Sequence, residues 1–470
     1  MRISRRFCAA VVLLFAAQAV YSLNNVSGKL QENLSGQDVA AIVSLDVDGT
    51  MDARDFLFIL TEMPELSSVD LSGVEITEYS SGESLFGNYV GFEAGELPAF
   101  CFSGKKLQSV ILPQSLRAIG EGAFSGCSQL RGVVLPASVE RVGDMAFSGC
   151  SALVSVEGAE GLESVGEYSF SKCRSLVSVE MPSLAMAGSH AFHMCESLAS
   201  FSFPAALTVI GEGAFMGTAL ESVDLSACGS LDVIGAWAFA DNDRLAEVVL
   251  PSGLESLGDG AFFYNVSLGK IVLPQGLVRI NDFTFTGGKL MDDSGFLPAS
   301  LKEIGDYALS DWRSLTEIII PENVEYIGTG AFRNQNALYK VEAMPVEPPA
   351  LGEDVWENVD KSTVKLVVPE NSEVAYRAAD QWKDFFNAAS AVNSVESDIK
   401  AIVNGNILTL TSGVVIREAS LYDLNGILLS VDNSPAETVD FYLGGYGGNV
   451  YIVRCVLDND KVELLKIVRD

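Results

Sequence analysis

The sequence predicts a leucine-rich repeat solenoid followed by a small all-β sandwich, and three observations carry this prediction. Between Leu107 and Leu338 the pattern L-x-x-V-x-L-P-x-x-L-x-x-I-G-x-x-A-F-x-x-C recurs about every 23 residues, in about ten copies. One position of nearly every copy is phenylalanine. Residues 393–470 instead alternate short apolar runs with turn dipeptides. Repeats of this length stack as short parallel strands and helical turns, and each needs its neighbours for a core.

The chain is strongly acidic, which narrows the range of its partners. It has 62 Asp and Glu against 30 Lys and Arg, a formal net charge of −32 over 470 residues. Such a surface repels nucleic acid and anionic lipid. The sequence contains no C-x-x-C pair. We therefore expect a monomer with no nucleic-acid partner, no metal site and no cofactor.

Residues 1–22 have the pattern of a secretory signal peptide. A basic start precedes an apolar stretch from Phe7 to Val20, with small residues at Ala17, Ala19 and Ser22. The stretch is too short and wrongly flanked for a membrane span. We expect an exported protein.

Residues 23–106 do not follow the repeat, and we expect them to cap the first coil. The pattern predicts a strand near Ile42–Val47, a helix from about Met51 to Met63 and a strand at Leu66–Leu71. A cap is needed because the end of a solenoid otherwise exposes its apolar interior.

One motif in this capping segment is a candidate for catalysis. Asp46-Val-Asp48-Gly49-Thr50 after an apolar run resembles the nucleophile motif of haloacid-dehalogenase-type phosphatases. No long alternation of strands and helices follows to build the doubly wound sheet that this chemistry needs. We therefore predict that the chain is not an enzyme, and a phosphatase that depends on Asp46 and Asp48 is the weakest alternative.

The repeated phenylalanines share one phase and should stack into a buried column, with Leu309 in the ninth copy. Each fully buried ring contributes about 1.5–3 kcal/mol. The residues are Phe124, Phe147, Phe170, Phe192, Phe215, Phe239, Phe262, Phe285 and Phe332.

A glycine precedes the phenylalanine in most copies, from Gly120 to Gly328, and Asn281 replaces it in the eighth. Because Asn tolerates left-handed backbone angles best after Gly, we predict a turn with positive φ at this position. The next residue is usually Asp or Glu, which predicts the N-cap of a short helical turn carrying A-F-x-x-C. A cation-binding ridge is the alternative for this acidic column.

Four cysteines, Cys127, Cys150, Cys173 and Cys195, recur at the repeat period. We expect them to be small buried thiols in one column rather than a disulfide framework. Disulfide bonds between the cysteines of neighbouring coils are the alternative.

The strand of each repeat alternates inward and outward side chains, so one position per strand faces solvent. These residues are Ile111, Val134, Glu157, Glu180, Ser202, Asp224, Val249, Val272 and Ile319. The column is apolar at both ends and polar at its centre. We predict a ligand-binding surface at Glu157, Glu180, Ser202 and Asp224. The alternative is that the apolar members only favour strands and the acids only keep the surface soluble.

Residues 339–392 read as the C-terminal cap of the solenoid. Prolines interrupt the repeat, Val364–Val368 supplies a last strand, and an amphipathic helix is predicted from about Ser372 to Phe386. Its aromatic residues would cover the final coil.

The repeats from Leu107 onward, such as "LQSVILPQSLRAIGEGAFSGCS", resemble the BspA-like leucine-rich repeat family. The resemblance implies a secreted or cell-surface protein of a host-associated microbe, linked to adhesion, and it supplies no catalytic residues. In residues 393–470, "ASLYDLNGILLS" and "GNVYIVRCVLDNDKVELLKIV" resemble the sorting domain of the type IX secretion pathway. That resemblance implies export through the outer membrane of a Gram-negative bacterium and attachment to the cell surface, or release.

We therefore predict an adhesin-like binding protein for host or microbial macromolecules, with an extracellular protein or glycan as ligand. A surface spacer without a specific ligand is the main alternative.

Overall fold

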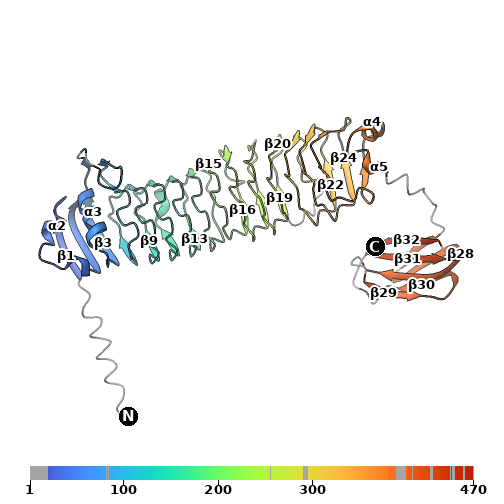
Figure 1. The fold of residues 1–470 in the computed structure, drawn as a ribbon, viewed down its shortest axis with the longest axis horizontal. Coiled ribbons are helices and arrows are strands. Elements are labelled where there is room, and N and C mark those ends of the chain that lie inside the picture. The colour runs from blue at the N-terminus through green and yellow to red at the C-terminus, as the bar shows by residue number, and fades with distance from the viewer. Residues whose placement is uncertain are drawn as a thin grey trace, which may run out of the picture. The chain divides into compact units, whose positions relative to one another are not determined.

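The computed structural model describes residues 20–80, 82, 84–254, 256–288, 295–387, 399–404, 406–423, 427–444, 446, 450–458 and 461–468. The chain divides into two compact units, Met1–Phe386 and Asn387–Asp470 (Figure 1). Residues 1–19, most of the predicted signal peptide, lie outside the described residues. No helix in the described ranges is long and apolar enough to cross a membrane.

One row of parallel strands runs along the solenoid, with one strand in most coils, and it begins in the N-terminal segment. The first sheet has the order β1 (Val20–Asn25), β2 (Ser44–Met51), β3 (Ser68–Ile76) and β7 (Ser109–Ile111). Three three-stranded sheets continue the row: β9 (Gly132–Val134), β11 (Ser155–Glu157) and β13 (Ser178–Val179); β16 (Ser222–Asp224), β18 (Glu247–Val249) and β19 (Lys270–Val272); β22 (Glu317–Ile320), β24 (Lys340–Ala343) and β26 (Lys365–Val367).

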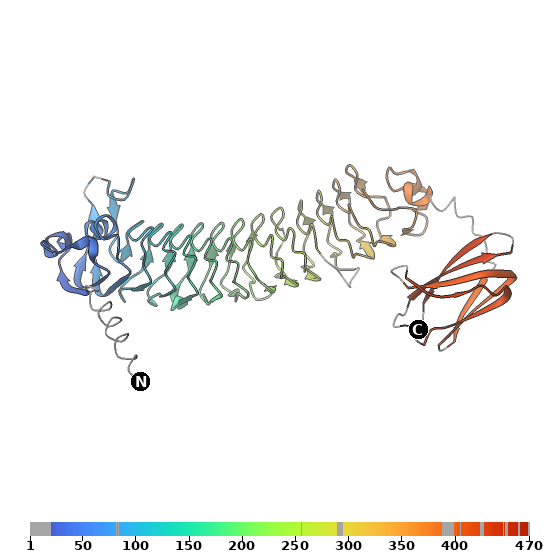
Figure 2. The same ribbon diagram turned by 60° about the horizontal axis from the view of Figure 1, so that its bottom comes forward.

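A second row of two-residue parallel strands lies later in most of the coils, which follow one another along the solenoid in Figure 2. Its first sheet comprises β6 (Glu96–Leu97), β8 (Ala118–Ile119), β10 (Arg141–Val142), β12 (Ser164–Val165), β14 (Met186–Ala187), β15 (Val209–Ile210) and β17 (Val233–Ile234). Its second comprises β20 (Arg279–Ile280), β21 (Glu303–Ile304), β23 (Tyr326–Ile327) and β25 (Ala350–Leu351). The predicted fold class is confirmed: a solenoid of parallel strands precedes a small β domain.

The phenylalanine column is confirmed as the core of the solenoid. From Phe124 to Phe285 neighbouring rings stack with centroids 5.0–5.5 Å apart, and each ring is at most 1% exposed. Phe102 and Trp356 extend the column beyond the interval predicted for the repeats. The stack supplies each coil with the second layer that it lacks alone.

The prediction of positive φ at the consensus glycine is wrong, because that glycine is required by close contact instead. None of the glycines from Gly120 to Gly328 in this column has a positive φ, and nor has Asn281. A Cβ atom at these glycines would lie 2.2–2.9 Å from the backbone of the preceding coil. Nothing in the structure explains why Asn281 is tolerated.

Positive φ occurs in two other columns of the repeat. The first lies two residues after the consensus glycine, with φ between 52° and 61°: Gly122, Met145, Tyr168, His190, Gly213, Trp237, Gly260, Phe283, Tyr307 and Gly330. The second immediately precedes the cysteine position: Gly126, Gly149, Lys172, Met194, Gly217, Asp241, Tyr264, Gly287, Asp311 and Asn334.

These left-handed residues also overturn the predicted helical turn, since A-F-x-x-C forms turns without a helix in every described coil. Three aspartates of the acidic column, Asp144, Asp282 and Asp306, instead accept backbone N–H groups of the next coil. A carboxylate oxygen of Asp144 accepts the Glu167 N–H at 2.8 Å, and Asp282 accepts that of Asp306 at 2.9 Å.

The cysteine column is a hydrogen-bonded ladder, and its thiols are buried and free. The Cys150 thiol donates to the Phe124 carbonyl of the preceding coil at 3.1 Å, and Cys127, Cys173 and Cys195 do the same to theirs. Further on, the Asn242 amide donates to the carbonyls of both Phe215 and Phe239. Asn265 repeats this arrangement one coil later.

The N-terminal segment adds the short helix α2 (Leu30–Asn33), the 3-10 turn η1 (Val39–Ala41) and α3 (Ala53–Glu62). The buried Asp52 and Asp55 form a capping box at the start of α3, and Asp55 also accepts the N–H groups of Gly28 and Leu30. A hairpin of β4 (Tyr79–Ser80) and β5 (Gly91–Phe92) follows. A second 3-10 turn, η2, spans Ala159–Gly161.

The single helix predicted for the C-terminal cap is wrong, since the structure has α4 (Glu373–Ala378) and α5 (Asp384–Asn387). Gln381 has φ +60° between them, and its amide donates to the Gly352 carbonyl and accepts the Val355 N–H. The helix is interrupted at Gln381, where the side chain forms these hydrogen bonds to the last coil. Trp382 and Phe385 are buried against Trp356, as a cap requires.

The second unit is one antiparallel sheet folded into two layers around a single core. Its strands are β27 (Ile399–Asn404), β28 (Ile407–Tyr422), β29 (Leu428–Asp432), β30 (Ala436–Tyr442), β31 (Val450–Leu457) and β32 (Val462–Val468). The long β28 belongs to both layers. Its first half pairs with β27 and β30, and its second half with β29 and β31.

Replacement of a consensus glycine should destabilise the solenoid through this contact. A Cβ at Gly258 would lie 2.2 Å from the Ala236 nitrogen, whereas one at Gly276 meets nothing within 4 Å. We expect Gly258→Ala to cost about 1–3 kcal/mol and Gly276→Ala less than about 0.5 kcal/mol. Urea unfolding measures both, and equal effects would contradict the close-contact explanation.

The buried thiols should resist alkylation while the chain is folded. Burial raises the pKa of Cys127 and of Cys195 to about 12, so little thiolate exists at pH 8. We expect iodoacetamide to modify these residues at least about a hundredfold faster in urea than in buffer. Because the folded state binds these protons more tightly, their contribution to stability is intact below about pH 8.5 and is lost as the pH rises through about 12. Rapid labelling of the folded chain at pH 8 would refute the ladder.

Candidate ligand-binding surface

The outward column of the first strand row lies where the alternation of the strands predicts. The side chains of Glu157, Glu180, Ser202 and Asp224 are all exposed. Their neighbours on the column include Val134, which is 62% exposed and pairs in register with Glu157. The polar centre and its apolar flank therefore share one solvent-facing side of the coils.

Of the four predicted residues, the structure brings Glu157 and Glu180 together. Both line a groove of about 440 Å³ that also includes Glu160. Its remaining lining residues are Ser155, Val156, Gly158, Ala159, Ser178, Val179 and Pro182. We call this the Glu157 groove. None of its three carboxylates forms an ion pair with a described residue.

Ser202 and Asp224 lie outside this groove, because the strand row is interrupted between them and Glu180. Residues 199–203 form no strand, and β13 and β16 belong to different sheets. Phe201 and Phe203 occupy the inward positions there and pack against Phe215, with centroids 5.0 and 5.3 Å away. These rings are larger than the Val and Leu of other coils, which accounts for the interrupted ladder.

Asp224 is held by its own turn rather than by a neighbouring coil. Its carboxylate accepts the Ser226 N–H at 2.9 Å. Hydrogen bonds from the Ser226 side chain and backbone lower the pKa of Asp224. It therefore stays charged on the surface of β16.

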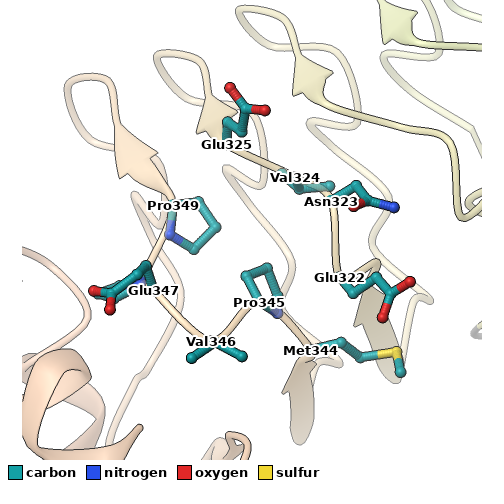
Figure 3. A pocket seen from close by; sticks show the side chains of 10 residues that line it. Glu322, Asn323, Val324, Glu325, Met344, Pro345, Val346, Glu347 and Pro349 are labelled. Atoms are coloured by element: carbon teal, nitrogen blue, oxygen red, sulfur yellow. The ribbon is translucent and has the colours of Figure 1, made fainter.

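A second groove, at the C-terminal end of the solenoid, has a volume of about 510 Å³ and was not predicted (Figure 3). Residues 322–325 of one coil and 344–349 of the next enclose it, and we call it the Met344 groove. The sequence contains one signal for it: Leu338 to Gly352 is one residue longer than the matching interval from Leu315 to Gly328. From the sequence, the prolines of this loop were interpreted only as part of the C-terminal cap, and no groove was predicted.

Aromatic side chains also gather on the turns of later coils. Trp237 and Phe263 lie 5.0 Å apart, and Phe283 stacks on Tyr307 at 5.2 Å. Tyr264 is 46% exposed and lines a groove of about 300 Å³ with Asp311 and Arg313. A fourth groove, of about 220 Å³, contains the 2.9 Å ion pair of Arg141 and Glu96.

The four grooves do not contain the candidate catalytic residues. Asp46 and Asp48 lie within β2, which continues to Met51, and neither lines any of the four grooves. Within the described ranges no three His, Cys, Asp or Glu side chains are arranged to hold a metal ion. The carboxylates of the grooves can accept hydrogen bonds and attract cations.

Because Glu157 and Glu180 are exposed and unpaired, their charge should be dispensable for folding. We expect Glu157→Gln combined with Glu180→Gln to change the free energy of unfolding by less than about 0.5 kcal/mol. Thermal and urea unfolding measure this. A larger loss would assign these residues to the architecture and remove them as candidates for ligand binding.

Comparisons with known proteins agree with this architecture. Residues 95–220, 183–291, 208–339 and 257–371 match the family described as BspA type leucine rich repeat region. A leucine-rich repeat protein of Bacteroides ovatus has the same fold, with a TM-score of 0.56 and 21% identity over 72% of this chain and 86% of its own.

Two further solved structures are similar over long stretches. A leucine rich cell surface protein of Faecalibacterium prausnitzii is 20% identical over 63% of this chain and 88% of its own, with a TM-score of 0.35. The pneumococcal vaccine antigen PcpA is 17% identical over 71% and 76%, with a TM-score of 0.39. No curated protein matches the chain. Since the family matches together span residues 95–371, more than half of the sequence, the chain belongs to the BspA-type leucine-rich repeat family.

Proposed function

We propose that the chain is a secreted or cell-surface binding protein whose outward strand column holds an extracellular protein or glycan. The observation that carries the proposal is the Glu157 groove, where three exposed carboxylates line a concavity without a basic partner. Charged groups in such a position attract and orient a partner and add little to folding. An adhesin-like role toward host or microbial macromolecules fits this surface. The family, a repeat family with no enzymatic activity indicated, supports it.

The proposed export signal ends at Ala19. The sequence Ala17-Gln18-Ala19 has the small residues that signal cleavage needs. Cleavage after Ser22, the end of the predicted signal peptide, would remove half of β1 and its pairing with β2. We therefore propose Val20 as the mature N-terminus.

The second unit serves in this proposal as the address for the cell surface. It has its own core, so it can be recognised as a separate module. Among the described strands, β32 pairs with β31 alone, and it exposes Val462 by 49% and Leu464 by 70%. An edge strand with exposed apolar side chains is open to another chain. This supports, beside the sequence resemblance, a sorting or attachment role.

The test is binding of the mature chain to arrays of glycans and extracellular matrix proteins. We expect at least one ligand at micromolar concentration, with affinity about tenfold lower for Glu157→Gln plus Glu180→Gln. Glu167→Gln plus Glu212→Gln, which removes the same charge from the turns, is the matched control and should bind like wild type. Absence of any ligand, or equal losses in both variants, would favour a surface spacer.

A further inference from the structure

We propose that the Met344 groove binds an extended basic segment of a partner protein, in which a lysine or arginine stands beside an apolar side chain. This inference rests on the proposed binding role of the solenoid and names a partner class and a second site for it. The occupant is a polypeptide, and the groove supplies both an apolar wall and an acidic rim.

The groove has a wall that is fixed before any partner arrives. The Tyr376 hydroxyl donates to the Pro345 carbonyl at 2.8 Å, and the Trp382 indole N–H donates to the Pro349 carbonyl at 3.0 Å. Both donors are fully buried in the C-terminal cap. The loop from Pro345 to Pro349 is thus anchored at its two ends. A loop held in this way loses little conformational entropy when it is bound.

This anchored loop nevertheless presents apolar side chains to solvent. Met344 is 45% exposed and Val346 is 67% exposed, whereas Val324 on the facing coil is buried. Figure 3 shows the two segments running side by side, with Met344 and Glu322 at the same end of the groove. Exposed apolar side chains on a fixed, concave surface are typical of a docking site.

The rim of the groove carries negative charge without compensation. Glu322, Glu325 and Glu347 line it and are exposed, no Lys or Arg lines it, and none of the three forms an ion pair with a described residue. Lys340, on the neighbouring strand, instead pairs with Glu317 at 3.4 Å and Glu342 at 3.0 Å. Lys340 is thus used on β22 and β24, and Lys302, which lies in the adjoining coil beside Glu325, is not among the residues that line the groove. A concave site of one sign concentrates counter-charge, so a cationic partner is favoured.

Lysine and arginine fit both parts of this groove better than other groups do. Their hydrocarbon stems can lie on Met344 and Val346 while the charged head reaches the glutamates. The prolines lack N–H groups, so this wall offers side-chain contacts and few backbone donors. A peptide can place several side chains along the two facing stretches, 322–325 and 344–349, whereas a single cation would leave the apolar wall uncovered.

The experiment uses the mature chain and three labelled nonapeptides, (Lys-Pro-Val)₃, (Lys-Pro-Ser)₃ and (Glu-Pro-Val)₃, with fluorescence anisotropy at physiological salt. We expect (Lys-Pro-Val)₃ to bind most tightly. Glu322→Gln, Glu325→Gln and Glu347→Gln together should weaken it about tenfold, which corresponds to about 1.4 kcal/mol for the three rim charges together. Met344→Ser plus Val346→Ser should reduce binding to the level of (Lys-Pro-Ser)₃.

The matched control is Glu157→Gln, Glu160→Gln and Glu180→Gln, which removes three carboxylates from the other groove. It should leave peptide affinity within about twofold of wild type. Equal losses in both triple variants would show non-specific charge attraction and overturn the proposal, as would a lack of binding or an unchanged affinity in the Met344 groove variants. If a glycan or matrix ligand depends on Glu157 and Glu180 while (Lys-Pro-Val)₃ does not bind, the proposed function stands and this inference fails.

Discussion

The close approach of successive coils at the consensus glycine is the constraint on which the rest of the solenoid depends. There the backbone of one coil occupies the space that a side chain of the next would need. The same spacing places the core rings 5.0–5.5 Å apart and brings each coil within hydrogen-bonding distance of its neighbour. Stacking, strand pairing and the thiol ladder therefore all follow from one distance between coils, and none of them is stable in a single repeat.

Regular stacking leaves little freedom except at outward positions and corners, and both candidate surfaces occur where a coil departs from the pattern. Phe201 and Phe203 interrupt the strand row beside the Glu157 groove. One additional residue after Leu338 opens the Met344 groove. In a protein of this kind the consensus maintains the scaffold, so specificity has to come from the exceptions. Such exceptions also cost little stability when a neighbouring element, such as the cap at Trp382, holds the altered loop.

The sequence was sufficient for the solenoid, the phenylalanine column and the outward column, because each depends on a residue type repeated at a fixed period. It was insufficient for the backbone angles of the turns. Glycine at Gly120 was interpreted as a sign of positive φ, but a missing side chain equally serves close packing, and composition does not separate the two causes. The positions with positive φ hold Met145, Tyr168 and Trp237, which no propensity argument selects. The Met344 groove depends on the partners of two buried donors, which only coordinates reveal.

The change of residue along the cysteine column divides the solenoid into parts of unequal mechanical strength. Each thiol is a weak donor that joins its coil to one carbonyl behind it. The amides of Asn242 and Asn265 donate to two carbonyls each, and the Asn265 oxygen also accepts the Asn242 N–H. Under tension along the solenoid, we expect the coils joined by thiols to separate first. Rupture would therefore begin near Cys127–Cys195, on the N-terminal side, and leave the asparagine-clamped coils and the cap that carries the Met344 groove intact.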